Sequence, residues 1–284
     1  MLIKAVMMCK NEDELLSIWG GYHGHLLGFE NLHVVDNGST SSASLAALDA
    51  LETLGAHIDR GFPRVEDYPA KGQITARTIQ RLDAEAPADF YFPLDCDEFL
   101  AVEHSPYALD CTREGLEREL EPQADFDGVL TIQAGYDNNP EVPGTYVRSP
   151  EQRKAFFARG ACTDLDHGSH IGFARSEHRI QTRVVYLHHH YKPFEQLVRH
   201  AREKLLPFVD DLSAEMLPQH RLNGVPGHHL ISHLELEDEA QYLAAYRGRD
   251  YRPVPAFTSA LERLGLHTPY DGQAAGPGRP TNTR

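Results

Sequence analysis

Two carboxylates separated by one residue follow an apolar run near position 95. The run 90–94, Phe-Tyr-Phe-Pro-Leu, predicts a buried strand, and Asp95 and Asp97 come directly after it. Two carboxylates in this arrangement can bind a hard divalent cation such as Mg²⁺ or Mn²⁺, which prefers oxygen ligands. A cation held there could neutralise the charge of a diphosphate leaving group. A solvated acidic turn is the alternative interpretation of the same residues.

The Asp-x-Asp pattern alone is a weak signal, because it occurs three times in the chain. It recurs at Asp125-Phe126-Asp127 and at Asp164-Leu165-Asp166. Only the first copy follows an apolar strand of a regular strand–helix unit, where ligands of α/β proteins bind. Position therefore favours Asp95 and Asp97 as the metal ligands.

Histidine is unusually frequent, with 17 residues in the chain. His167 and His170 follow Asp164 and Asp166, so this segment could add a third ligand to a metal site. The run 188–190 is three consecutive histidines. If these histidines end a strand, His189 faces the opposite side from His188 and His190. One side of the strand could then contact a ligand while the other packs against the protein.

Strands and helices alternate over the first hundred residues, which predicts parallel strands covered by helices on both faces. Apolar runs predict strands at residues 2–8, 32–35, 56–58 and 90–94. Asn11 is expected to cap the first helix, and Lys71 and Gln73 are placed in the loop before the third. Since ligands sit at the carboxyl ends of such strands, Asn11, Glu12, Asp36 and Asp95 fall where a site is expected.

The second half of the chain is less regular. Residues 135–144 are read as a polar loop and 194–205 as a helix, with further helices at 236–247 and 256–264. The interpretation is one domain over residues 1–235, a helical C-terminal extension over 236–270 and a flexible tail over 271–284.

The composition argues against several classes of function. The net charge is −15, which opposes general binding of nucleic acids. The four cysteines form no Cys-x-x-Cys pair, which favours a reducing, cytoplasmic location. No apolar run approaches the roughly 18 residues of a membrane span, and no signal peptide is recognisable. The oligomeric state is left open.

A series of motifs, in order along residues 3–205, resembles the family 2-like glycosyltransferases, and most closely the branch similar to family 92. The motifs are Lys10-Asn11-Glu12, Trp19 with His23, Leu27-Gly28-Phe29, Asp36-Asn37-Gly38-Ser39, Asp95-Cys96-Asp97-Glu98-Phe99, Lys154, Gly168-Ser169-His170, His190-Tyr191 and Lys204. The combination is more specific than any single motif.

The resemblance implies a GT-A fold, an α/β nucleotide-binding sandwich with a central, mostly parallel sheet. It implies metal-dependent transfer of a hexose from a nucleotide-sugar, here a UDP-sugar, to a glycan or other hydroxyl acceptor, with inversion. Nucleotide-binding roles are implied for Asn11, Glu12, Asp36, Lys71, Gln73 and Asp95. Mn²⁺ or Mg²⁺ would be bound by Asp95, Asp97 and His170, and His190 would contact the diphosphate or the metal.

The sequence identifies neither the general base nor the acceptor. An inverting transfer needs a carboxylate as general base, and the candidates are Asp137, Asp164 and Asp166. The segment 134–139 departs from the family pattern, which leaves the acceptor unidentified. The competing functions are a zinc-dependent hydrolase that uses the histidines at 167, 170 and 188–190, and a sugar- or nucleotide-binding protein without catalysis.

Overall fold

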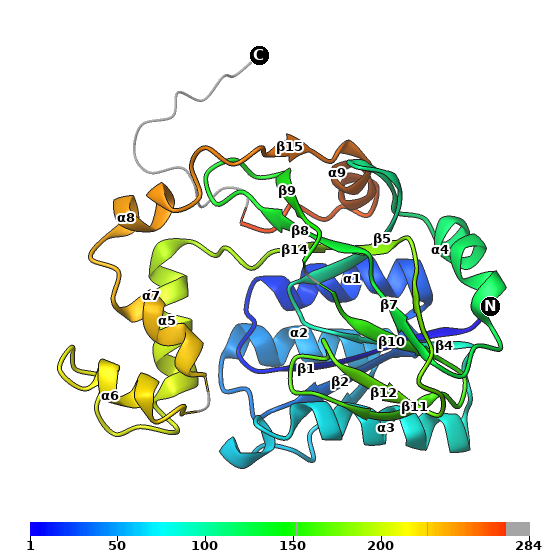
Figure 1. Cartoon of the computed structure of the whole chain (residues 1–284), viewed down its shortest axis with the longest axis horizontal. Helices are drawn as coiled ribbons and strands as arrows, with labels where there is room; N and C mark the ends of the chain where they lie inside the picture. The colour runs from blue at the N-terminus through cyan, green and yellow to red at the C-terminus, as the bar shows by residue number, and fades with distance from the viewer. Residues whose placement is uncertain (152, 226, 271–284) are drawn as a thin grey trace.

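A mostly parallel sheet forms the centre of the molecule (Figure 1). The computed structural model describes residues 1–151, 153–225 and 227–270, so the tail expected at 271–284 lies outside the described residues. Within them, the strand order of this sheet is β13-β7-β10-β4-β1-β2-β3. The strands are β1 (Ile3–Cys9), β2 (Leu32–Asp36), β3 (His57–Asp59), β4 (Phe90–Leu94), β7 (Val129–Thr131), β10 (Ala155–Ala158) and β13 (Arg179–Gln181).

Strand direction confirms the predicted α/β class with a central, mostly parallel sheet. β1 pairs in parallel with both β2 and β4, and β2 pairs in parallel with β3. β10 runs antiparallel to β4 and β7, whereas β13 is parallel to β7. The parallel strands therefore place the ends of β1, β2 and β4 at one edge of the sheet.

Helices cover both faces of this sheet, which is why β1 is apolar on both sides and buried along its whole length. Ala5 and Met7 belong to the core that includes α1 (Leu15–Leu27) and α2 (Ser42–Thr53). Val6 points the other way, into the core that includes α3 (Lys71–Glu85). This alternation is the ordinary period of two along a strand.

A second sheet packs beside the first, with the strand order β15-β9-β8-β14-β5-β6. Its strands are β5 (Glu98–Ser105), β6 (Ala108–Asp110), β8 (Ala134–Asn138), β9 (Thr145–Ser149), β14 (Val184–His188) and β15 (Arg252–Pro253). A separate hairpin pairs β11 (Cys162–Leu165) with β12 (Gly172–Ala174). β5 begins immediately after the Asp95–Asp97 turn, so this turn joins the two sheets.

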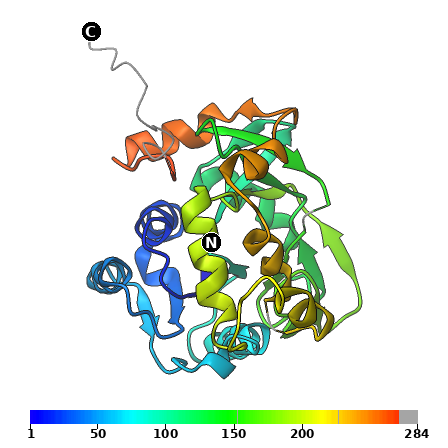
Figure 2. The same ribbon diagram turned by 90° about the vertical axis from the view of Figure 1, so that its left-hand side faces the viewer.

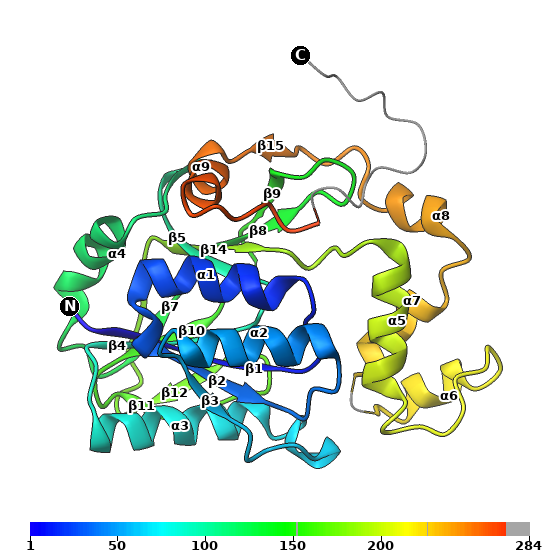
Figure 3. The same ribbon diagram turned by 180° about the vertical axis from the view of Figure 1, so that it is seen from behind.

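The remaining helices are α4 (Arg113–Leu120), α5 (Phe194–Leu205), α6 (Leu217–Leu222), α7 (Ile231–Leu234), α8 (Glu239–Ala244) and α9 (Pro255–Arg263), with short 3-10 helices at η1 (Phe29–Asn31), η2 (Val65–Asp67), η3 (Glu121–Gln123) and η4 (His228–Leu230). Four of the remaining helices, α5 to α8, lie at one end of the molecule. Figures 1 and 3 show α5 to α8 beyond the sheet edge where β1 ends, and Figure 2 shows α5 in front of that edge. Among the described residues, no helix is both long and apolar enough to cross a membrane.

The segment 236–270 contacts the rest of the chain through both α8 and α9. The ring of Phe257 on α9 lies 5.3 Å from that of Tyr22 and 5.4 Å from that of Phe99, between ring centroids. The hydroxyl of Tyr242 on α8 donates to the carbonyl of Lys192 at 2.9 Å. Both α8 and α9 are therefore fixed against the preceding part of the chain.

Three local predictions are wrong. Asn11 does not cap α1, which begins at Leu15; it adopts a left-handed conformation with φ of 52°. Lys71 and Gln73 lie in the first turn of α3 rather than in a loop before it. Residues 135–138 are not a loop but part of the buried strand β8, because they pair with β14 and β9 on both sides.

The burial of His23 is expected to make folding depend on pH. This side chain is fully buried, its Nδ1 donates to the Trp19 carbonyl at 3.0 Å, and its Nε2 accepts from the Leu100 amide at 3.3 Å. Burial lowers the pKa of His23 to about 3, only partly offset by the Trp19 carbonyl. The unfolded chain, with an ordinary histidine pKa, therefore binds one more proton, and stability falls as pH drops from about 6.5.

We expect His23→Gln to reduce the pH dependence of the free energy of unfolding below pH 6.5. This one group contributes about 1.4 kcal/mol per pH unit between about pH 6 and pH 4. Urea unfolding at a series of pH values measures the slope. His25→Gln, at an exposed position on the same helix, is the control and should keep the wild-type slope. Equal slopes in the wild-type chain and in His23→Gln would contradict the prediction.

Candidate functional site

A cavity of about 900 Å³ opens where β1 and β4 end. One wall comes from the segments that follow β1 and β2, and the floor comes from the turn at residues 95–98. β14 and the residues after it, together with α5 and the segment after α8, complete the opposite wall. The cavity therefore lies at the carboxyl ends of parallel strands, where α/β folds bind ligands.

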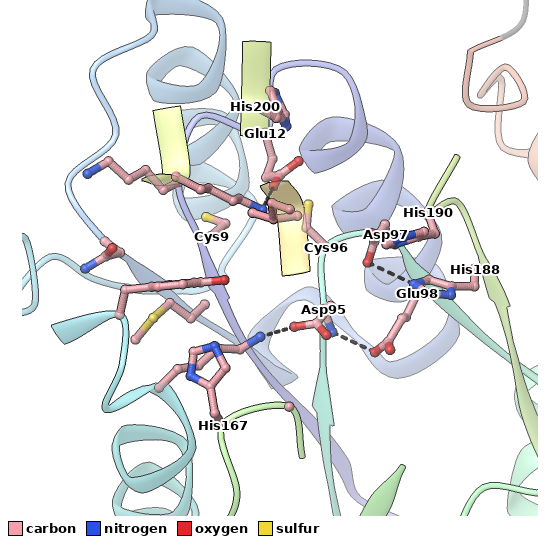
Figure 4. A pocket seen from close by; sticks show the side chains of 18 of the residues that line it. Cys9, Glu12, Asp95, Cys96, Asp97, Glu98, His167, His188, His190 and His200 are labelled. Carbon is pink, nitrogen blue, oxygen red and sulfur yellow. Dashed lines mark hydrogen bonds and ion pairs between the residues drawn. The ribbon is translucent and has the colours of Figure 1, made fainter. Parts of the chain in front are cut away.

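Asp97, His188 and His190 form a group that could hold a metal ion. One ligand atom from each lies within 4.8 Å of the others, and all three side chains are partly buried. Figure 4 shows them gathered on one side of the cavity. His188 and His190 share a side of the chain, with ring centroids 5.0 Å apart, because the side chains alternate at the end of β14.

His189 faces the opposite way, as the alternation predicts. It is buried, its Nε2 lies 3.0 Å from the Tyr146 hydroxyl, and its amide donates to the Asp97 carbonyl at 2.7 Å. Burial lowers the pKa of His189 to about 3, so the ring is neutral. Its backbone bond to Asp97 fixes the carboxylate turn against the histidine run.

Asp137 lies behind His188. The carboxylate of Asp137 on β8 is 3.1 Å from Nδ1 of His188, and Nε2 of the same ring lies 3.8 Å from the Asp97 carboxylate. Burial lowers the pKa of His188, but the bond to Asp137 and the charge of Asp97 outweigh it and raise that pKa to about 9. A carboxylate that accepts from Nδ1 leaves Nε2 directed at the cavity, which is the usual arrangement behind a metal-binding histidine.

Asp95 is held by two lysines. Nζ of Lys154 lies 2.8 Å from one carboxylate oxygen of Asp95, and Nζ of Lys71 contacts the other. Burial alone would raise the pKa of Asp95, but Lys154 and Lys71 hold it well below its usual value. Lys154 also contacts Glu98, which in turn accepts from the Asp95 amide at 2.8 Å.

A second buried ion group lies across the cavity from Asp95 (Figure 4). Glu12 is 2.9 Å from Nζ of Lys192 and 3.8 Å from Nζ of Lys204 on α5. Burial would raise the pKa of Glu12, yet these two ammonium groups lower it. Glu12 therefore links the end of β1 to α5 and closes one side of the cavity.

Asn11 joins the loops after β1 and β2. Its side-chain oxygen accepts from the amides of Thr40 and Ser41 at 2.8 and 3.0 Å, and its own amide donates to the Ser39 hydroxyl at 3.1 Å. Asp36 is buried and accepts from the Ser39 amide at 2.9 Å, which forms the turn after β2. Asn11 lines the cavity, whereas Asp36 supports the wall from behind.

The other predicted site residues separate into two groups. Asp166 and His170 line the cavity, but Nδ1 of His170 lies 2.8 Å from the Arg153 carbonyl. Gln73 and Asp164 have exposed side chains outside the cavity lining. Within the described ranges, the metal-type group contains Asp97 and His190 from the prediction, but neither Asp95 nor His170.

The sequence analysis named His188 only in the zinc-hydrolase alternative and not in the metal site of the transferase, and it missed Lys154 as the partner of Asp95. The alternation that separates His189 from its neighbours places His188 and His190 on one face, so this pattern alone could have suggested both. Nothing in the sequence predicts the Lys154 contact, because β10 reaches β4 only through the sheet order.

Comparisons with known proteins found distant structural similarity only. No protein-family model and no curated protein matches the sequence. A crystal structure of S. aureus TarS is 10% identical to this chain, with a TM-score of 0.38. The match covers 98% of this chain and 50% of the TarS chain, so this chain spans about half the length of TarS. A TarS structure in complex with UDP-GlcNAc is 13% identical with a TM-score of 0.38, covering 93% of this chain and 80% of that one.

A third similar structure is glucosyl-3-phosphoglycerate synthase from Mycobacterium tuberculosis, in complex with Mn²⁺, UDP and glucosyl-3-phosphoglycerate. It is 15% identical with a TM-score of 0.33, and covers 72% of this chain and 78% of that chain. TM-scores at this level carry no argument about activity.

Proposed function

We propose that this chain is a metal-dependent glycosyltransferase of the GT-A type, family 2-like and similar to the family 92 branch. It transfers a hexose from a nucleotide-sugar, a UDP-sugar, to the hydroxyl group of an acceptor, with inversion at the anomeric carbon. Residues 1–235 are the transferase domain and residues 236–270 its extension. A cytoplasmic location is part of the proposal, in keeping with four free cysteines.

One observation carries the proposal: Asp97, His188 and His190 meet inside a large cavity at the carboxyl ends of parallel strands. One carboxylate and two imidazoles are a donor set for a transition metal, and their mutual distances fit a single ion. Mn²⁺ suits this set better than Mg²⁺, which prefers oxygen ligands. A cation bound there stabilises the negative charge of a departing diphosphate.

The residues around this group have separable tasks. Asn11 and Asn37 border the end of the cavity beside β1 and β2, where a nucleoside fits. Asp137 holds His188 in the orientation that directs Nε2 at the cavity. Lys71 and Lys154 fix Asp95 and with it the turn that carries Asp97.

The transfer forms a bond between the acceptor oxygen and the anomeric carbon, while the bond from that carbon to the diphosphate oxygen breaks. The bonding electrons leave with the nucleoside diphosphate, and the acceptor proton passes to a carboxylate. Of the three candidate bases, Asp166 lines the cavity, Asp137 is bonded to His188, and Asp164 is exposed outside it.

A thermal-shift panel tests the proposal. UDP, GDP, CDP, dTDP and NAD are each added with and without Mn²⁺, Mg²⁺ or Zn²⁺, because a ligand that binds the native state raises the melting temperature. We expect UDP with Mn²⁺ to give the largest shift. At 100 times its dissociation constant a ligand stabilises by about 2.7 kcal/mol, or several degrees.

Two results would count against a metal-dependent glycosyltransferase. A shift with Zn²⁺ alone and none with any nucleotide would favour the hydrolase, the second candidate function. A nucleotide shift that does not depend on any metal would contradict the role of Asp97, His188 and His190.

A further inference from the structure

The wall of the cavity next to His190 carries an aromatic pair and an arginine. Tyr191, Tyr246 and Arg249 all line the cavity, and the last two come from the segment that follows α8. The rings of Tyr191 and Tyr246 are 4.1 Å apart between centroids, tilted by 46°. The guanidinium carbon of Arg249 lies 4.9 Å from the centroid of Tyr246, and one of its nitrogens donates to the Tyr191 hydroxyl at 3.1 Å.

The positive charge of Arg249 is not neutralised by a carboxylate in the part of the chain that the structure describes. The neighbouring arginines, unlike Arg249, have carboxylate partners. Arg247 pairs with Glu141 at 2.7 Å, and Arg252 pairs with Asp250, also at 2.7 Å. In a chain of net charge −15, an arginine without such a partner on a cavity wall is available to an anionic ligand.

This wall lies away from the end of the cavity assigned to the nucleoside. Sheet order runs from β2 through β1 to β4, and the turn after β4 carries Asp97 into the second sheet, where β14 supplies His188. Tyr191 therefore follows β14 of the second sheet, close to His190, whereas Asn11 follows β1 of the first sheet. A group that accepts a sugar must approach the anomeric carbon from the side opposite the diphosphate.

We propose that Tyr191, Tyr246 and Arg249 form the acceptor subsite and select an acceptor ring that carries an oxyanion, a carboxylate or a phosphate. This proposal rests on the proposed function, since it names the acceptor class of the same site. The aromatic faces pack against the C–H face of the ring, and the guanidinium binds the oxyanion through paired N–H donors. The position of α8 is fixed by the bond from Tyr242 to the Lys192 carbonyl.

The test uses the full chain loaded with Mn²⁺ and UDP, and three probes: glucose, glucuronate and glucose 6-phosphate. Paramagnetic relaxation of probe protons by the bound Mn²⁺ is titrated to give a dissociation constant, and it reports binding inside the cavity. We expect at least one anionic probe to bind about tenfold or more tightly than glucose. Preference for glucuronate identifies a carboxylate acceptor, and preference for glucose 6-phosphate a phosphate acceptor.

Matched variants separate the charge from the aromatic surface. Arg249→Gln should remove the preference for the anionic probe and leave UDP binding unchanged. Arg247→Gln, which removes a neighbouring arginine that is already paired, should retain the preference. Tyr246→Leu should weaken binding of all three probes alike, with its melting temperature reporting whether the fold is intact.

Several results would overturn the inference without touching the proposed function. An anionic preference that persists in Arg249→Gln belongs to the cation rather than to this arginine. Equal binding of all probes to the wild-type protein removes the basis for an anionic acceptor. Loss of UDP binding in Arg249→Gln assigns the arginine to the donor. Failure of UDP to bind the wild-type chain would instead reject the proposed function itself.

Discussion

Asp97→Ala is expected to remove nearly all turnover and leave the fold intact. Asp97 supplies the only carboxylate of the metal-type group among the described residues, and the two imidazoles alone hold a divalent cation weakly. We expect release of UDP from a UDP-sugar to fall by about 10²- to 10³-fold, the usual loss when a preorganised electrostatic stabiliser is removed. Electron paramagnetic resonance of Mn²⁺ measures the loss of metal binding directly.

Asp127, which belongs to another Asp-x-Asp segment of the chain, provides the control. Asp127 is exposed and lies outside the cavity lining, so Asp127→Ala should keep wild-type turnover and Mn²⁺ affinity. Asp97→Asn keeps the shape of the side chain and should fail like Asp97→Ala, because the charge is what the cation needs. Full activity in Asp97→Ala would refute the metal–diphosphate mechanism.

Lys154→Met is expected to cause the largest loss of stability among single changes in the site. Lys154 is 1% exposed and neutralises two carboxylates, those of Asp95 and Glu98. Removing one member of a buried ion group leaves charge without compensation, which costs about 3–5 kcal/mol. Urea unfolding with a common slope measures the change in the free energy of unfolding.

A second substitution tests whether the loss comes from uncompensated charge or from packing. In Lys154→Met, Asp95 keeps its contact with Lys71, whereas Glu98 loses its lysine partner. Adding Glu98→Gln removes that uncompensated charge, so the double variant should be more stable than Lys154→Met alone. Arg159→Met breaks an exposed pair with Asp89 and should cost about 1 kcal/mol or less. A double variant that is no more stable than Lys154→Met would show that packing, not charge, dominates.

Local sequence patterns predicted much of the fold. The apolar runs of β1 and β4 are short and continuous, and buried parallel strands need apolar side chains on both faces. The helical spacing of Leu197, Ala201 and Leu205 predicted α5, and these three side chains are buried. Such signals work because period and burial are properties of neighbouring residues.

Local patterns failed where a neighbouring strand determined the structure. Residues 135–138 contain glycine, aspartate and asparagine, which favour turns, yet they form β8 between β14 and β9. Asn11 has the type of a helix cap, but its side chain instead bonds the amides of Thr40 and Ser41 in the loop after β2. Tertiary hydrogen bonds outweighed local preference in both cases.

The sequence by itself determined the strand–helix order, and therefore that Asp97 would lie at the carboxyl edge of a sheet. It also determined that His188 and His190 share a face, since side chains alternate along a strand. Only the tertiary structure decided that these two segments meet, that Asp137 lies behind His188, and that Arg249 reaches the cavity. Asp137 and His188 are 51 positions apart in the sequence, and Asp97 and His188 are further apart still. The distances between such residues depend on how the two sheets pack, which no local pattern specifies.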